Sequence, residues 1–121
     1  MLRDAAHVVT LHGEDRNRDV LFLVGLDMAA RQRLQAAVQR WGFTVVPADK
    51  AHLKGVDPQN ICNRGRWRAG VQIEMAKGLR RTLFESLTVV GCQSRTSRFN
   101  DLVLAIREGI GAEPAPQQIT N

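Results

Sequence analysis

Hydrogen-bonding side chains are concentrated in one short stretch in the middle of the chain. Five of the nine positions from 60 to 68 are asparagine or arginine: Asn60, Asn63, Arg64, Arg66 and Arg68. The planar guanidinium group of arginine binds a carboxylate or phosphate through two parallel hydrogen bonds. The alternative is that these residues are solvated loop charges with little energetic weight. Five such residues in nine positions favour a binding site for an acidic ligand.

One acidic residue, Glu74, follows this stretch inside an apolar run. Residues 71–75, VQIEM, alternate as a strand does, so that Gln72 and Glu74 share one face and the apolar residues the other. A carboxylate near the end of a sheet strand lies where open α/β sheets bind their ligands. Burial beside apolar groups favours its use as a general base. The alternative is a structural carboxylate that pairs with a nearby arginine.

A histidine occupies a comparable position earlier in the chain. His12 closes the apolar run 7–11, HVVTL, and is followed by Gly13, which predicts an imidazole exposed at the end of a strand. Histidine is the commonest metal ligand, but a lone histidine is also a common structural residue. His7 and His52 add no metal-binding spacing, so spacing alone establishes no metal site.

An alternation of strands and helices must position these groups. The pattern of apolar residues and of turn residues predicts an α/β layered sheet. Asp27 is a candidate N-cap, and Gly42 a stop, for the clearest helix. We expect strands over 7–11, 20–25, 43–46 and 71–75, helices over 28–41, 79–87 and 98–109, and a long loop over 47–70.

The bulk composition fits one globular domain. The chain has 121 residues, of which 44% are hydrophobic and 24% charged, and its formal net charge of +5 attracts anions. Cys62 and Cys92 lack a CxxC spacing, and we expect both to be reduced thiols. No segment approaches the apolar length of a signal peptide or of a membrane span, so we expect a cytoplasmic protein without membrane contact.

Residues 53–84, LKGVDPQNICNRGRWRAGVQIEMAKGLRRTLF, resemble the closing part of the poly-γ-glutamate hydrolase family, which are phage-type zinc peptidases. The shared pattern includes Asp-Pro-x-Asn-Ile-Cys-Asn-Arg-Gly, then Gly-Val-Gln-x-Glu and Gly-Leu-Arg. Upstream, HVVTLHG at 7–13 and LFLVGLD at 21–27 resemble two strands of the same family.

The resemblance implies a fold, a cofactor and site residues. The implied fold is a three-layer α/β/α sandwich with a mixed sheet, carboxypeptidase-like (phosphorylase/hydrolase-like), formed by residues 1–112 with a flexible tail over 113–121. The implied chemistry is cleavage of γ-glutamyl amide bonds with Zn²⁺. His12 matches the last zinc ligand and Glu74 the catalytic carboxylate. Asn63, Arg64 and Arg66 are the candidates for binding the acidic substrate.

Members of the family also carry an N-terminal half with His-Gly-Gly followed by Glu, which provides the first two zinc ligands. This sequence begins after that region, so we expect an N-terminally truncated domain with an incomplete ligand set. A single imidazole cannot hold catalytic zinc, which takes three protein ligands and one open position.

Three functional hypotheses follow. The first is a zinc hydrolase fragment that cleaves poly-γ-glutamate only when another chain supplies the missing ligands. The second is a non-catalytic module that binds an acidic polymer. The third, a nucleic-acid binder, is disfavoured by two tryptophans, no tyrosine and no stacking motif. Because half of a sandwich exposes a strand edge and a sheet face, we expect a complementing chain or a homodimer.

Overall fold

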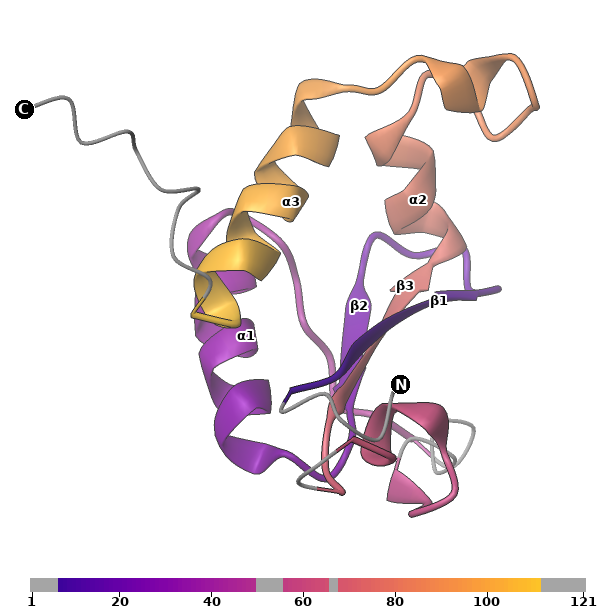
Figure 1. Cartoon of the computed structure of the whole chain (residues 1–121). Helices are drawn as coiled ribbons and strands as arrows, with labels where there is room; N and C mark the ends of the chain where they lie inside the picture. The colour runs from indigo at the N-terminus through magenta and orange to yellow at the C-terminus, as the bar shows by residue number, and fades with distance from the viewer. Residues whose placement is uncertain (1–6, 50–55, 66–67, 112–121) are drawn as a thin grey trace, which may run out of the picture.

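The computed structural model describes residues 7–49, 56–65 and 68–111. These residues form a three-stranded sheet and three α-helices (Figure 1). In chain order the elements are β1 (Val9–Glu14), β2 (Leu21–Val24), α1 (Met28–Arg40), the 3-10 turn η3 (Ile61–Asn63), β3 (Val71–Ala76), α2 (Lys77–Leu83), the 3-10 turn η4 (Gly91–Gln93) and α3 (Ser97–Gly109).

The sheet is mixed, with the strand order β1-β3-β2. β1 runs parallel to β3, and β2 runs antiparallel to β3. β3 is therefore the central strand, and each of its residues has a partner on one or both sides. The predicted α/β class with a mixed sheet is confirmed.

One face of the sheet carries the main core. Inward-pointing residues of the strands alternate with those of the other face, and the three helices cover this face together, with α1 and α3 side by side (Figure 1). The buried residues of this core are Leu21, Leu23, Val71 and Ile73 from the strands, Ala30, Leu34 and Val38 from α1, Phe43 from the segment after α1, Leu79 and Leu83 from α2, and Leu102 and Ala105 from α3.

The opposite face has a different composition. A small apolar cluster of Val20, Phe22 and Ala76, with Val46 packed against it, lies at one end. Val24 of β2, the partner of Gln72, is also on this face. The positions from the other two strands hold mostly polar side chains, because Thr10, His12 and Glu14 alternate with the core-facing residues of β1, and Gln72 and Glu74 with those of β3. We call this surface the polar face. Among the residues described, no helix packs on it.

Most predicted elements are confirmed. Asp27 caps α1, since its side chain accepts a hydrogen bond from the backbone N–H of Ala30 at 3.0 Å. Gly42 follows the helix with a φ of +89°, a conformation that glycine adopts without strain. All four residues of β2 are buried, as its continuous apolar run predicts.

Two predictions about strands are wrong in part. Residues 43–46 form only an isolated parallel bridge between Leu21 and Val45, so this segment is shorter as a strand than expected. The apolar residues of the run 7–11 predict a buried strand that ends before His12. Instead β1 continues to Glu14 and is an edge strand, with Leu11 58% exposed. A strand at an edge has neighbours on one side only, which leaves even β-branched and apolar residues accessible.

The long loop over 47–70 is anchored at its end by a close backbone approach. A Cβ atom at Gly70 would collide with the carbonyl oxygens of Cys62 and Val8, so a side chain here would separate the loop from the start of β1. The backbone N–H of Asp27 donates to the carbonyl of Gly70 at 3.1 Å. This end of the loop is therefore fixed against both β1 and α1.

In the described part of the chain, no helix is long and apolar enough to cross a membrane. The predicted tail, residues 113–121, lies outside the described residues, and the boundary at residue 112 stays a prediction.

Candidate active site on the polar face

His12 and Glu74 lie side by side on the polar face. They are direct partners in the register of the parallel strands β1 and β3. Neighbouring strands are about 4.8 Å apart, and directly opposed residues point to the same face. The imidazole is exposed and the carboxylate is half-buried. The sequence separated these residues by more than half the chain, and the sheet brings them together.

Two amide side chains connect Glu74 to the long loop. Gln72, which is 4% exposed, donates from Nε2 to Oε1 of Glu74 at 3.1 Å. Oε1 of Gln72 in turn accepts a hydrogen bond from Nδ2 of Asn60 at 3.3 Å. This relay fixes the orientation of the Glu74 carboxylate from the side of the loop. The sequence predicted that Gln72 and Glu74 share a face, but gave no signal for the contact with Asn60.

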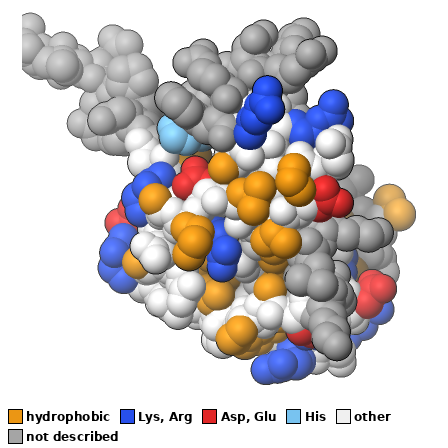
Figure 2. Space-filling view, turned by 90° about the horizontal axis from the view of Figure 1, so that it is seen from below, with side chains coloured by type: hydrophobic (Ala, Val, Ile, Leu, Met, Phe, Trp, Pro, Cys, Tyr) orange, Lys and Arg blue, Asp and Glu red, His pale blue; other side chains and the backbone are white. Residues whose placement is uncertain are grey.

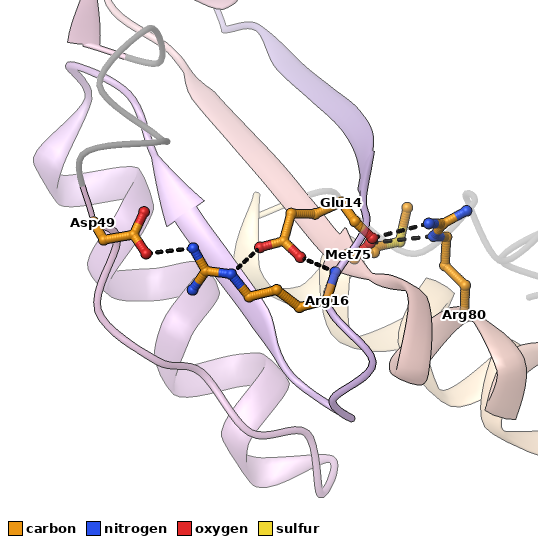
Figure 3. A network of polar contacts seen from close by, with 5 residues as sticks. All are labelled: Glu14, Arg16, Asp49, Met75 and Arg80. Carbon is orange, nitrogen blue, oxygen red and sulfur yellow. Dashed lines mark hydrogen bonds and ion pairs between the residues drawn. The ribbon is translucent and has the colours of Figure 1, made fainter.

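An arginine that sequence analysis did not select lies on the same face (Figure 3). Nε of Arg16 is 2.9 Å from Oε2 of Glu14, and its guanidinium also pairs with Asp49. The guanidinium lies over the ring of Phe22, 4.9 Å from its centroid. Phe22 is the partner of Glu74 in the antiparallel register, so this cation sits beside the candidate base.

The charge of Arg16 is held firmly. The hydrogen bond to Asp49 is the main cause that raises the pKa of Arg16, and the negative charges of Glu14 and Glu74 raise it further. The surrounding carboxylates therefore favour the charged guanidinium. Arg16 lies just beyond the end of β1, in a charged loop whose sequence carried no distinguishing motif.

The predicted substrate-binding residues have different surroundings. Arg64 is exposed at the C-terminal end of η3, which lies against both β1 and β3. Arg66 lies outside the described residues. Asn63 is only 1% exposed.

Asn63 holds the loop together. Its Oδ1 accepts hydrogen bonds from the backbone N–H groups of Leu26, at 3.1 Å, and Gly70, at 3.0 Å. Its Nδ2 donates to the carbonyl of Asp57 at 2.9 Å. With all of these bonds made inside the protein, the side chain offers no surface to a ligand. Contact between Asn63 and substrate stays a prediction, and this burial argues against it.

Comparison with known proteins identifies the family of this chain. The family model of poly-gamma-glutamate hydrolase matches residues 1–105. The chain belongs to the poly-gamma-glutamate hydrolase family. Residues 9–76, which contain the whole sheet, lie within the matched region.

Two proteins of Bacillus subtilis (strain 168) are similar to this member of the family. UPF0714 protein YndL is 33% identical over 79 residues, which cover 64% of this chain and 31% of YndL. UPF0714 protein YmaC is 24% identical over 108 residues, which cover 88% of this chain and 46% of YmaC.

Two solved structures share the fold. A bacteriophage poly-gamma-glutamate hydrolase matches with a TM-score of 0.85 and 25% identity, over 92% of this chain and 55% of its own. A zinc-free structure of YndL matches with a TM-score of 0.77 and 25% identity, over 88% of this chain and 54% of its own. The chain therefore spans about half the length of the two solved chains that it matches, and its sequence alignments cover 31% of YndL and 46% of YmaC.

The described residues do not by themselves form a catalytic zinc site. Within 7–49, 56–65 and 68–111, no group of three or more His, Cys, Asp or Glu side chains is placed to hold a metal ion. Catalytic zinc takes three protein ligands. His12 and Glu74 are adjacent, while Glu14 is engaged by Arg16 through both its carboxylate oxygens.

A hollow of about 340 Å³ lies elsewhere on the molecule. Arg31 and Gln35 of α1 provide its polar wall, and Leu23 with residues 45–48 provides the rest. It borders β2, at the edge of the sheet opposite β1. The hollow is therefore separate from the pair His12 and Glu74.

Proposed function

We propose that this chain binds poly-γ-glutamate at the polar face and contributes to cleavage of its γ-glutamyl amide bonds, with further residues supplied from outside this sequence. The observation that carries the proposal is the direct pairing of His12 with Glu74 on one sheet face of a member of the hydrolase family. An imidazole and a carboxylate at one strand position suit a hydrolytic site.

In this proposal Glu74 is the general base. It accepts a proton from the water whose oxygen attacks the amide carbonyl, and it returns a proton to the nitrogen of the leaving amine as the C–N bond breaks. Gln72 holds one carboxylate oxygen of Glu74 in place, and this also fixes the direction in which the second oxygen points. His12 is the ligand that we propose this chain contributes to zinc, which then requires at least two ligands from outside this sequence.

Basic side chains attract the polymer. Each residue of poly-γ-glutamate carries a free carboxylate, and the chain has a net charge of +5. Arg64 is exposed at the end of η3, which contacts both β1 and β3. We propose that it binds a substrate carboxylate. Arg66, two residues later, is proposed from its sequence position alone.

We also propose that a second polypeptide packs along β1, either a complementing chain or another copy. β1 is paired only with β3 among the described strands, and Leu11 on this strand is 58% exposed. Figure 2 shows the side of the molecule seen from below, where apolar side chains gather with basic side chains among and around them. Exposed strand edges and apolar patches promote association.

A second candidate function is a non-catalytic module that binds acidic polymers. The observation in its favour is that the described residues do not assemble three metal ligands. Such a module would retain the basic loop and the fold while lacking turnover. Nucleic acid is the other acidic polymer it could bind, and a steep loss of affinity with salt for DNA and poly-γ-glutamate alike would indicate non-specific electrostatics.

One experiment separates these functions. The chain is mixed with zinc and with a polypeptide spanning the part of the bacteriophage hydrolase that it does not match, and release of glutamate oligomers from poly-γ-glutamate is measured. We expect release from the mixture only, abolished by Glu74→Gln and retained by Glu85→Gln, an exposed control. Polymer binding should survive Glu74→Gln and weaken with Arg64→Ala. Binding without release from any mixture would favour the non-catalytic module.

A further inference from the structure

Arg80 bonds to the ends of two strands at once. From α2, its NH2 donates to the carbonyl of Glu14 in β1 at 2.9 Å, and its Nε donates to the carbonyl of Met75 in β3 at 3.2 Å (Figure 3). These carbonyls lie at adjacent positions of the parallel register, in which Gly13 is the partner of Met75. A single guanidinium therefore joins β1 to β3 where both strands end.

The glycine of the His-Gly pair makes room for this contact. A Cβ atom at Gly13 would lie 3.1 Å from Cζ and 3.3 Å from NH1 of Arg80. That separation is tighter than most contacts of real Cβ atoms, so a side chain at position 13 would require the guanidinium to shift by a few tenths of an ångström. Gly13 and Arg80 thus form one unit, which we call the strand clamp.

The strand clamp lies directly behind the candidate site. Gly13 and Met75 are partners in the parallel register, and His12 and Glu74 are the residues immediately before them. Because successive residues of a strand point to opposite faces, His12 and Glu74 lie on the face opposite the strand clamp. β1 is an exposed edge strand, and such strands open locally more readily than central ones. A contact that holds the end of β1 to β3 therefore also holds the imidazole beside the carboxylate.

We propose that Arg80 is a positioning residue for the pair His12 and Glu74. It acts from the helical side of the sheet through the backbone, and it touches neither side chain. The functional part of this inference rests on the proposed function, whereas the structural part, control of the strand register by Arg80, does not.

Backbone amide exchange measured by NMR on the whole chain tests the structural part. Arg80→Ala should speed exchange in the β1–β3 ladder at residues 12–14 and 74–76 by at least about tenfold, while amides of α1 and α3 are unchanged. Arg80→Lys should not restore protection, because an ammonium group lacks the planar fork that reaches both carbonyls. Arg81→Ala is the matched control, since this exposed neighbour bonds only to Asn17 among the described residues.

A second measurement distinguishes positioning from simple stabilisation. Under conditions where each variant is fully folded, NOEs between the ring of His12 and the side chain of Glu74 should weaken in Arg80→Ala and remain in Arg81→Ala. Gly13→Ala should reproduce the loss and serves if Arg80→Ala fails to fold. Unchanged exchange and NOEs, uniform loss of protection across the helices, or full rescue by Arg80→Lys would each overturn the inference.

Activity gives a separate readout. In the complemented mixture, Arg80→Ala should lower kcat and leave KM for poly-γ-glutamate unchanged, because the polymer-binding loop is not altered. If no mixture cleaves the polymer, the proposed function fails while the exchange and NOE results still decide the role of Arg80 in the register. If Arg80→Lys restored kcat fully, the requirement for a planar guanidinium that bonds to both carbonyls would be contradicted.

Discussion

Replacement of Asn63 by alanine tests whether this residue holds the loop or binds substrate. Its Oδ1 accepts from the backbone N–H groups of Leu26 and Gly70, and its Nδ2 donates to the carbonyl of Asp57. The side chain is 1% exposed, so Asn63→Ala removes these three bonds inside the protein.

The two N–H groups determine the size of the effect. A buried donor left without an acceptor costs about 1 to 3 kcal/mol. The bond to Gly70 is buried, whereas that to Leu26 is partly buried and water can replace part of it. The carbonyl of Asp57 also accepts a hydrogen bond from the backbone N–H of Asn60 at 2.9 Å, so it keeps a partner. We therefore expect Asn63→Ala to lower the free energy of unfolding by about 2 to 4 kcal/mol, which a domain with about 5 to 15 kcal/mol of stability can tolerate.

Urea unfolding followed by circular dichroism measures this change as a shift of the midpoint at constant slope. Asn100→Ala, at an exposed position of α3, is the control, and its unfolding free energy should stay within about 0.5 kcal/mol of the unmodified chain. A change for Asn63→Ala no larger than that of the control would refute the structural role. Loss of polymer binding at unchanged stability would instead support the contact with substrate predicted from the sequence.

Two further predictions concern Glu108 and the two cysteines, which are ionisable groups outside the pair His12 and Glu74. Hydrogen bonds from Arg40 and Trp41 lower the pKa of Glu108, so its contribution to stability is present above its ordinary value of 4.5 and is lost as the pH falls through the lowered pKa. The difference in urea midpoint between the unmodified chain and Glu108→Gln should therefore close in acid, and a constant difference would argue against this contact. Burial raises the pKa of the Cys62 thiol, while Cys92 is exposed, so a thiol reagent should modify Cys92 roughly a hundredfold faster. Equal rates would contradict the burial of Cys62.

The sequence predicted those features that depend on local patterns. Asp27 and Gly42 mark the ends of α1 because capping and left-handed turns require particular residue types. Alternation over 71–75 placed Gln72 and Glu74 on the same face, and the strand β3 confirms it. The motif pattern also led to the family, because it spans contiguous residues.

Features that depend on strand order could not be predicted in the same way. Nothing in the run 7–11 shows that β1 is an edge strand, since exposure depends on which strands are its neighbours. The contacts of Arg80 with Glu14 and of Arg16 with Asp49 join residues far apart in sequence, and arginines with these contacts look like any other charged residue. The hydrogen-bonding side chain of Asn63 made it a candidate for substrate binding. In the folded protein the same side chain bonds to backbone groups of the loop.

The proposed function depends most on the placement of His12 and Glu74 at one register position of the sheet, on the same face. A ¹³C-edited NOESY spectrum of the chain, assigned for both residues, tests this directly. We expect NOEs between the imidazole protons of His12 and the methylene protons of Glu74, as required by their pairing in the parallel register. NOEs from the His12 ring to buried residues of α2, such as Leu79, with none to Glu74, would place the imidazole on the helical face and contradict the proposed function.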